Sequence, residues 1–277
     1  MQWLRCLAVW IGVGVAAAQP AVAQTGEAPL RVGVVPQFTS ARIESTWQPL
    51  LAEVGRRAGV SLVLAPSPSI PDFERRFEQG EFDLVYLNPY HQIMASRAQG
   101  YRPILRDVSR QLFGILVVRK DSPVTRVEDL EGQVVAFPAP NALGASLMMR
   151  AALANRFKIH FTPRYVKTHT SVYLNVMLGE AAAGGGVMAT FREQKPEVSE
   201  GLRILYETDK VPPHPISVHP RVPKAVADRL VEAFMAIGAG PEAAALLGDI
   251  PIGQIGPASE ADYEPLTAMG LEAVYER

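Results

Sequence analysis

The sequence predicts an α/β protein of two lobes, and three observations support this prediction. Short apolar segments typical of buried strands alternate with segments of helical periodicity, which favours strand–helix units around a mainly parallel sheet. The alternation occurs both before and after a long apolar segment at residues 111–120, and a proline-rich stretch at residues 211–215 provides a return crossing. We therefore expect lobe 1 to comprise residues 28–112 and 215–277, and lobe 2 to comprise residues 113–214.

The first unit begins with LRVGVV at residues 30–35, a compact apolar run that ends at Pro36 and is typical of a buried strand. A helix follows, because Trp47, Leu50, Leu51 and Val54 recur at helical spacing, and it ends at Gly59. The later elements expected in this unit are a strand at 60–64, a short helix after Pro71, a strand at 83–87 and a helix from Pro89 towards Gln99.

The second unit repeats this order after the long strand expected at residues 111–120. Its expected strands are 134–137 and 164–166, and its expected helices are 144–155 and 171–178. Further strands are expected at 203–206 and 216–218, with amphipathic helices around 226–234 and 260–269. The glycines at 184–186 have two interpretations, a close approach to a ligand or a tightly packed strand end.

The N-terminus predicts export. Arg5 precedes an apolar run at residues 6–18, and Ala21-Val22-Ala23 supplies a small-x-small cleavage pattern, so we expect a signal peptide of residues 1–23, cleaved after Ala23. A membrane anchor is the alternative, but the run is short and is interrupted by Gln19 and Pro20. The only cysteine, Cys6, lies in the removed segment, so the mature protein has no disulfide and is expected in the periplasm.

Composition excludes some functions. The chain has 277 residues with 27 basic and 28 acidic side chains, a balance that argues against nucleic-acid binding by bulk electrostatics. The five histidines form no paired metal-ligand motif, and neither a nucleophile elbow nor an acid/base carboxylate pair stands out. We therefore expect no metal, no cofactor and no enzymatic activity.

Candidate ligand contacts lie in four loops that follow strands and open helices. In α/β sheets ligands bind beyond the carboxyl ends of strands, and helix N-termini favour anions. Helix capping alone is the alternative explanation for Asn88, Asn141 and Thr170. The expected ligand-binding residues are Gln37, Phe38, Asn88, Tyr90, His91, Asn141, Ala142, Thr168, His169, Thr170 and Ser171.

These segments resemble one known family. The sequences RVGVVPQF, GEFDLVYLNPYH, GILVVRKDSPVTRVEDLEGQVVAFPAPN, YVKTHTSVYLNVMLGEAAAGGG and VPPHPISVHPRVP are similar to the PhnD-like periplasmic binding proteins of phosphate, phosphite and phosphonate ABC transporters. The resemblance implies a type II periplasmic binding-protein fold with the ligand cleft between two lobes that close over it. It also implies a monomer that delivers a small anion to an ABC transporter permease.

The sequence departs from that family at one turn. Phosphonate-binding members carry a Ser-Thr-Ser turn where this chain has Ala142, Leu143 and Gly144, whereas the family histidine is matched by His169. No acidic residue stands in the GEAAAGGG stretch to meet an amine, so we do not expect 2-aminoethylphosphonate as the ligand. Another small anion is expected, or a less polar molecule held by Tyr90, Phe38 and Tyr173.

Three functions remain open at this point: a transport receptor, a ligand-sensing partner of a membrane histidine kinase, and an enzyme on a binding-protein fold. If His169 contacts an anion, its protonation would make affinity rise as the pH falls towards about 6.

Overall fold

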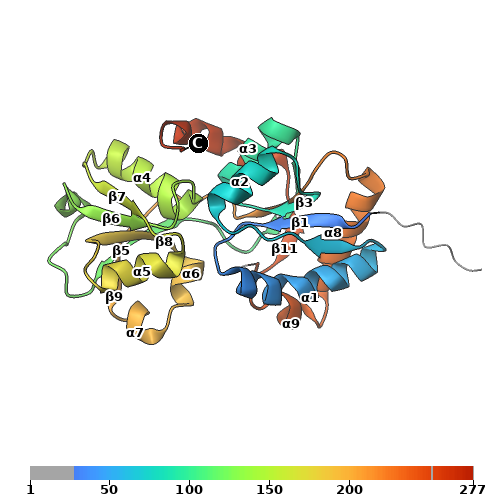
Figure 1. Ribbon diagram of the computed structural model, residues 1–277, viewed down its shortest axis with the longest axis horizontal. Coiled ribbons are helices and arrows are strands. Elements are labelled where there is room, and N and C mark those ends of the chain that lie inside the picture. Colours follow the sequence, from blue (N-terminus) through green and yellow to red (C-terminus); the bar gives the residue numbers. More distant parts are fainter. Residues whose placement is uncertain (1–27, 251, 277) are drawn as a thin grey trace, which may run out of the picture.

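The computed structural model describes residues 28–250 and 252–276, so the expected signal peptide and the cleavage site after Ala23 lie outside the described residues. The chain forms two α/β halves side by side along the long axis of the molecule, each built around its own sheet (Figure 1). Within the described part, no helix combines the length and apolar character that crossing a membrane requires. The two-lobed α/β architecture expected from the sequence is confirmed.

The six-stranded half contains both ends of the described chain. Its sheet has the order β11-β4-β10-β3-β1-β2. The strands are β1 (Leu30–Val34), β2 (Leu62–Leu64), β3 (Leu84–Tyr86), β4 (Arg102–Asp107), β10 (Pro215–Val218) and β11 (Ile255–Pro257). The helices are α1 (Ser40–Ala58), α2 (Ile70–Glu78), α3 (Pro89–Gln99), α8 (Lys224–Ala239), α9 (Ala243–Leu247) and α10 (Glu260–Tyr263), followed by the 3₁₀ turns η4 (Glu264–Met269) and η5 (Leu271–Ala273).

The five-stranded half has the sheet order β7-β6-β8-β5-β9. Its strands are β5 (Gly114–Arg119), β6 (Val134–Phe137), β7 (Thr162–Tyr165), β8 (Ala183–Val187) and β9 (Leu202–Glu207). Its helices are η1 (Val127–Leu130), η2 (Leu143–Met148), α4 (Met149–Ala151), η3 (Ala152–Arg156), α5 (His169–Met177), α6 (Met188–Arg192) and α7 (Pro196–Ser199). The segments η2, α4 and η3 form one continuous helical run over residues 143–156, in which η2 and η3 are π-helical.

The expectation of mainly parallel sheets is wrong, because both sheets are mixed. Strand β1 pairs in parallel with β2 and β3, but β10 runs antiparallel to β3 and β4, and β11 runs antiparallel to β4. In the other sheet β6 is parallel to β7 and β8, whereas β5 is antiparallel to β8 and β9. Two strands that run against their neighbours lie where the chain passes between the halves, since β5 enters the second sheet and β10 re-enters the first. The third, β11, is added to the edge of the first sheet near the C-terminus.

Two crossings connect the halves. Leu112 and Val211 form an isolated antiparallel bridge, with both N–H···O distances at 2.8 Å. The long strand expected at 111–120 therefore begins only at Gly114, and the preceding residues are a crossing.

The C-terminal segment is a third link between the halves, and we call residues 271–276 the C-terminal strap. The backbone N–H of Glu276 donates to Asn141 Oδ1 at 3.0 Å, and Asn141 Nδ2 donates to the Glu276 carbonyl at 2.6 Å. The guanidinium group of Arg150 binds the Glu276 carboxylate at 2.7 Å and also donates to the Val274 carbonyl. Figure 1 shows the C-terminal end (red) at the junction of the two halves.

Candidate functional site

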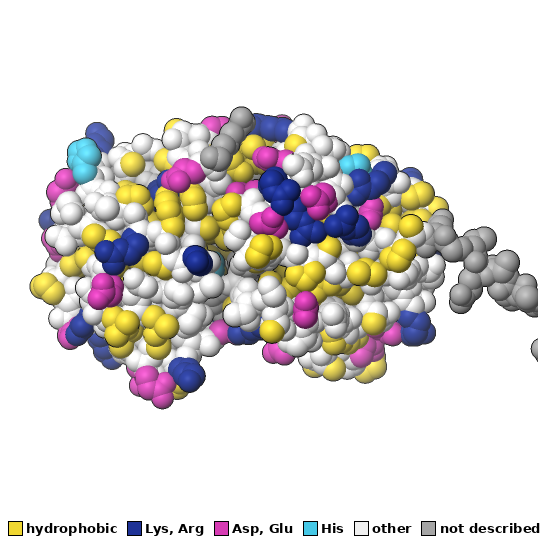
Figure 2. Space-filling view, in the orientation of Figure 1, with side chains coloured by type: hydrophobic (Ala, Val, Ile, Leu, Met, Phe, Trp, Pro, Cys, Tyr) yellow, Lys and Arg dark blue, Asp and Glu magenta, His cyan; other side chains and the backbone are white. Residues whose placement is uncertain are grey.

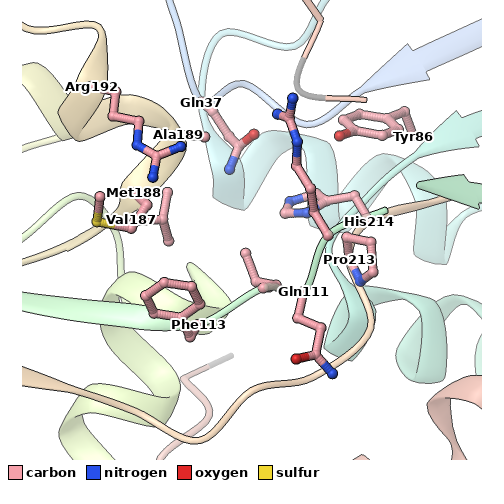
Figure 3. Close-up of a pocket in the computed structure, with 12 residues that line it drawn as sticks. Gln37, Tyr86, Gln111, Phe113, Val187, Met188, Ala189, Arg192, Pro213 and His214 are labelled. Atoms are coloured by element: carbon pink, nitrogen blue, oxygen red, sulfur yellow. The ribbon is translucent and has the colours of Figure 1, made fainter. Parts of the chain in front are cut away.

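Two adjoining hollows lie between the halves. We call the larger one the outer cavity; it has a volume of about 300 Å³ and is drawn in Figure 3. Its lining consists of Gln37, Tyr86, Arg110, Gln111, Leu112, Phe113, Val187, Met188, Ala189, Arg192, Pro213 and His214. Figure 2 shows the surface hollowed between the two halves.

The smaller hollow, which we call the inner recess, has a volume of only about 10 Å³, room for about one water molecule. Both hollows share Gln37, Leu112, Val187 and His214, so the recess adjoins the outer cavity. The remaining lining of the recess consists of Val35, Ile70, Asn88, Ala142, Leu143, Gly144, Ala145 and His169.

One wall of the recess is the start of the helical run 143–156. The Ala142 carbonyl accepts hydrogen bonds from the N–H groups of Ser146 and Leu147, at 2.7 and 3.1 Å. The N–H groups ahead of these have no partner within the helix and carry the positive end of its dipole. Because the residues of this wall that line the recess, 142–145, have no side-chain hydroxyl, they offer only backbone donors.

Two glycines allow that helix start to lie against the sheet. A Cβ on Gly114 would lie 2.0 Å from the Gly144 carbonyl oxygen, and a Cβ on Gly185 would lie 1.9 Å from the Ala145 carbonyl oxygen. The glycine run at 184–186 is thus a buried, tightly packed strand, β8, which supports the recess from behind.

His169 brings an imidazole to the recess at the first residue of α5. Thr168 caps this helix by accepting a hydrogen bond from the N–H of Ser171 at 3.1 Å. Just before it, Lys167 adopts a left-handed φ of 75°, a strained conformation that is common near functional sites.

The two nitrogens of His169 differ. Nδ1 lies 3.1 Å from the hydroxyl of Thr190, whereas the buried Nε2 has no hydrogen-bond partner among the described residues. Burial lowers the pKa of His169 to about 4. The ring of the empty protein is therefore neutral near pH 6. The expected rise of affinity as the pH falls towards about 6 stays a prediction, since it depends also on the pKa of His169 beside a bound anion.

A second histidine, His214, lines both hollows and was not among the expected site residues. Its ring stacks on that of Tyr86 with the centroids 5.3 Å apart. Burial, with smaller contributions from His91 and His169, lowers the pKa of His214 to about 3. The sequence feature that could have identified His214 is its position among the prolines of a predicted crossing.

Four of the expected site residues line the recess: Gln37, Asn88, Ala142 and His169. Asn88 also joins the halves, since its Nδ2 donates to the Asn141 carbonyl at 3.2 Å. This is the part of the expected site that the structure brings together.

The other residues expected from the six-stranded half lie elsewhere. Phe38 lies beneath Arg42, whose guanidinium carbon is 4.3 Å from the centre of the ring. Tyr90 is buried in an apolar cluster and packs against Tyr275, with the ring centroids 5.5 Å apart. His91 is also buried, and its Nε2 lies 2.8 Å from a carboxylate oxygen of Glu74. Neither residue lines the hollows. Tyr90 belongs to an apolar cluster that joins the two halves, since the cluster also contains Leu143 and Leu147, whereas His91 belongs to the packing of the six-stranded half.

The remaining residues expected from the five-stranded half support the site from outside its lining. Asn141 bonds to the C-terminal strap, and Thr168 and Ser171 cap α5. Thr170 is exposed. Tyr173, suggested as a ligand wall, is buried, and its hydroxyl lies 2.8 Å from that of Thr190.

The charges that line the outer cavity are all positive. Arg110 and Arg192 face it, and no Asp or Glu side chain lines either hollow in the part of the chain that the structure describes. Sequence reasoning missed both arginines, because neither lies in one of the four loops in which ligand contacts were expected. The described residues also contain no cluster of His, Cys, Asp or Glu that could hold a metal ion.

Comparison with known proteins gives consistent findings. Residues 32–263 match the family described as "ABC transporter, phosphonate, periplasmic substrate-binding protein". The phosphonates-binding periplasmic protein of Escherichia coli (strain K12) is 20% identical over 267 residues, which span 91% of this chain and 79% of that protein.

Two solved structures share the fold. PhnD1 from Prochlorococcus marinus (MIT 9301), solved in complex with methylphosphonate, has a TM-score of 0.78 and 14% identity, covering 88% of this chain and 97% of that one. A binding protein component of an ABC phosphonate transporter from Pseudomonas aeruginosa gives the same TM-score and identity, covering 88% and 86%. These likenesses extend over both halves of the molecule.

Proposed function

Because the chain belongs to the family of periplasmic substrate-binding proteins of phosphonate ABC transporters, we propose that it binds a phosphonate or a closely similar oxyanion in the hollow between its halves. One observation carries this proposal. The buried Nε2 of His169 has no partner among the described residues and lines a recess whose other wall is a helix start. A buried nitrogen of this kind is costly unless a ligand or water pairs with it.

The proposed contacts follow from the size of the recess. One phosphonate oxygen enters it and displaces the single water that it has room for. This oxygen accepts hydrogen bonds from backbone N–H groups at Leu143 and Gly144 and from the Nε2–H tautomer of His169. Each hydrogen bond to the charged oxygen contributes about 1.5–3 kcal/mol, so backbone donors compensate for the missing Ser-Thr-Ser hydroxyls.

Neutral donors suit this recess. Burial keeps the imidazoles of His169 and His214 uncharged, so the empty site does not have to bury a cation. The anion then brings the only charge into the recess and receives hydrogen bonds from oriented dipoles. The same lining lacks a carboxylate for an ammonium group, which argues against 2-aminoethylphosphonate.

We further propose that the halves close over the ligand by bending at the two crossings. The moving bodies are the lobes expected from the sequence, residues 28–112 with 215–277 and residues 113–214. In the arrangement described here, Arg42 of α1 pairs with Glu193, and Asn88 bonds to the Asn141 carbonyl, so contacts between the halves flank the hollow on two sides.

The remaining features of the proposal follow the family. The chain is exported, cleaved after Ala23, monomeric and without catalytic activity of its own, and it presents its ligand to the permease of an ABC transporter. A sensor kinase as partner is not favoured, because the matched family belongs to transporters.

Calorimetric titration of the purified protein with methylphosphonate tests the ligand proposal. We expect a single site, and His169→Ala weakens it by at least about tenfold because a hydrogen bond to the anion is lost. His160→Ala is the matched control, since that side chain is 93% exposed and lines neither hollow. Unchanged affinity in a folded His169→Ala protein would remove His169 from the site, and no binding by the unaltered protein would overturn the phosphonate proposal.

A further inference from the structure

We propose that the outer cavity is a subsite for a second anionic group, so that the preferred ligand is a phosphonate whose substituent carries a carboxylate or a similar anion. This inference rests on the proposed function, because it takes the phosphonate group to lie at the mouth of the inner recess. It adds the class of substituent, which neither the recess nor the family match specifies.

The first support is an arginine without an acidic partner. Arg192 ends α6, and Figure 3 shows its guanidinium group turned toward Gln37 and the centre of the cavity. Among residues 28–250 and 252–276, no carboxylate lies within ion-pair distance of Arg192. The neighbouring acid, Glu193, is already paired with Arg42 across the two halves.

A second arginine lines the same cavity with only a weak partner. The Nε of Arg110 lies 3.8 Å from the carboxylate of Asp107, which is too long for a hydrogen bond. That carboxylate is already occupied, since it accepts hydrogen bonds from the N–H groups of Ser109 and Gly253 at 2.8 and 2.6 Å. The exposed guanidinium group of Arg110 therefore makes no hydrogen bond to that carboxylate and has donors to offer at the cavity.

The rest of the lining favours an anion over a cation. Gln37 and Gln111 supply amide groups, and His214 is held neutral by burial. With two guanidinium groups and no acidic side chain facing it, the cavity repels an ammonium substituent and attracts a carboxylate. Arg192 is solvent-exposed, so screening by water and salt limits the attraction to a moderate one.

The volume of the cavity also exceeds what the smallest phosphonates fill. At about 300 Å³ it lies at the lower end of the range of about 300–1,000 Å³ typical of small-molecule sites. With one phosphonate oxygen in the recess, a methyl substituent leaves most of the cavity to water. A substituent that ends in a carboxylate fills more of this volume and brings its charge into the cavity that the arginines line.

Three phosphonates that differ in the charge of their substituent test this inference. They are methylphosphonate (neutral), phosphonoacetate (anionic) and 2-aminoethylphosphonate (cationic), each titrated calorimetrically into the purified protein at one pH and at low ionic strength. We expect phosphonoacetate to bind at least about tenfold more tightly than methylphosphonate, and 2-aminoethylphosphonate to bind more weakly than either.

Substitution of the two arginines tests whether the tighter binding of phosphonoacetate arises from the outer cavity. Arg192→Gln and Arg110→Gln together should lower the affinity for phosphonoacetate at least about fivefold more than the affinity for methylphosphonate, which loses only the longer-range attraction of the two charges. Lys195→Gln is the control, because it removes one positive charge three positions from Arg192 but outside the lining. It should leave all three affinities unchanged.

The outcomes separate the two proposals. If methylphosphonate binds and phosphonoacetate binds no more tightly, the second-anion subsite is overturned while the proposed function stands. An equal loss for both ligands in the double variant would also overturn the subsite, since the arginines would then hold the phosphonate group itself. The subsite would also be overturned if the double variant still bound phosphonoacetate more tightly than methylphosphonate by the same factor. If no phosphonate binds at all, the proposed function fails and this inference fails with it.

Discussion

The inner recess and the outer cavity share four lining residues but differ in burial and in charge. The recess is buried and lined by neutral donors, the helix start at residues 143–145 and the imidazole of His169. The outer cavity is open to solvent and lined by charged guanidinium groups. Hydrogen-bond geometry governs the first region and screened Coulomb attraction governs the second.

This difference indicates how one hollow can combine affinity with selectivity. A neutral donor in a desolvated recess costs little when the site is empty and binds strongly when a charged oxygen arrives. An exposed arginine costs almost nothing to keep in water and adds only a moderate preference. The predictions below test this division, starting with the largest effect.

The largest expected effect comes from displacing the wall of the recess. In Gly114→Ala, the new Cβ would lie 2.0 Å from the Gly144 carbonyl oxygen, so the helix start has to move. We expect calorimetry to detect no methylphosphonate binding and thermal melting to show a lower midpoint, because overpacking costs about 1–3 kcal/mol or more.

Gly238→Ala in α8 is the control for that substitution, since its Cβ would lie 3.3 Å from the nearest atom, on Ile255. We expect it to bind like the unaltered protein. Wild-type affinity in Gly114→Ala would mean that the helix start does not hold the ligand.

Acid should destabilise the protein through the buried histidines. The folded-state pKa values of His169 and His214 are lowered to about 4 and about 3, from an unfolded value near 6.5. Below about pH 6.5 the unfolded chain therefore binds more protons, so stability falls as the pH falls towards 4. Each histidine contributes up to about 1.4 kcal/mol per pH unit.

Urea unfolding at several pH values between about 4 and 8 measures this slope. His214→Gln should make the slope shallower, whereas His160→Gln should not, because His160 is exposed. An unchanged slope in His214→Gln would show that His214 is not buried as a neutral ring.

Salt should weaken binding at the outer cavity more than binding at the inner recess, and this difference should be smaller than the effects above. Raising the ionic strength from about 0.02 to 0.5 M should reduce phosphonoacetate affinity several-fold more than methylphosphonate affinity, because only the former reaches the exposed arginines. The measurement is a calorimetric titration of each ligand across that range. Equal salt dependence would contradict the division between recess and cavity.

The smallest effect on affinity is expected from the ion pair between Arg42 and Glu193, which joins the two halves. Arg42→Ala removes the exposed ion pair with Glu193 that joins the halves, and exposed pairs contribute at most about 1 kcal/mol. We expect methylphosphonate affinity to fall by less than about fivefold, measured by the same titration. A double-mutant cycle with Glu193→Ala checks whether the loss arises from this pair, since a zero coupling energy would rule it out.

Strands and helix starts could be predicted from the sequence where their side chains show a clear pattern of apolar or capping residues. Runs such as VVAF, which is β6, have apolar residues on both faces, and Thr168 ahead of α5 is a recognisable cap that places His169 next to a strand end. Strand β8 was harder to recognise, because AGGGV has few side chains to show alternation. The sequence also gave no sign of β4 and β11, which contain prolines.

The arginines and His214 could not have been placed from local patterns. Arg110, Arg192 and His214 are far apart in sequence and meet only because the two halves face each other across the crossings. Conversely, Tyr90 and His91 follow a strand end as ligand residues often do, yet the helix rotates them into the core. Which face of a helix start meets the hollow depends on packing, and sequence spacing does not define it.

The C-terminal strap has a practical consequence for anyone who uses this protein as a sensor. Glu276 is hydrogen-bonded to Asn141, which directly precedes the wall of the recess at Ala142. A fluorescent protein fused at the C-terminus would be attached next to the proposed ligand site, so we expect its signal to respond to ligand binding. A purification handle intended to be silent belongs instead ahead of β1, at the other end of the described chain.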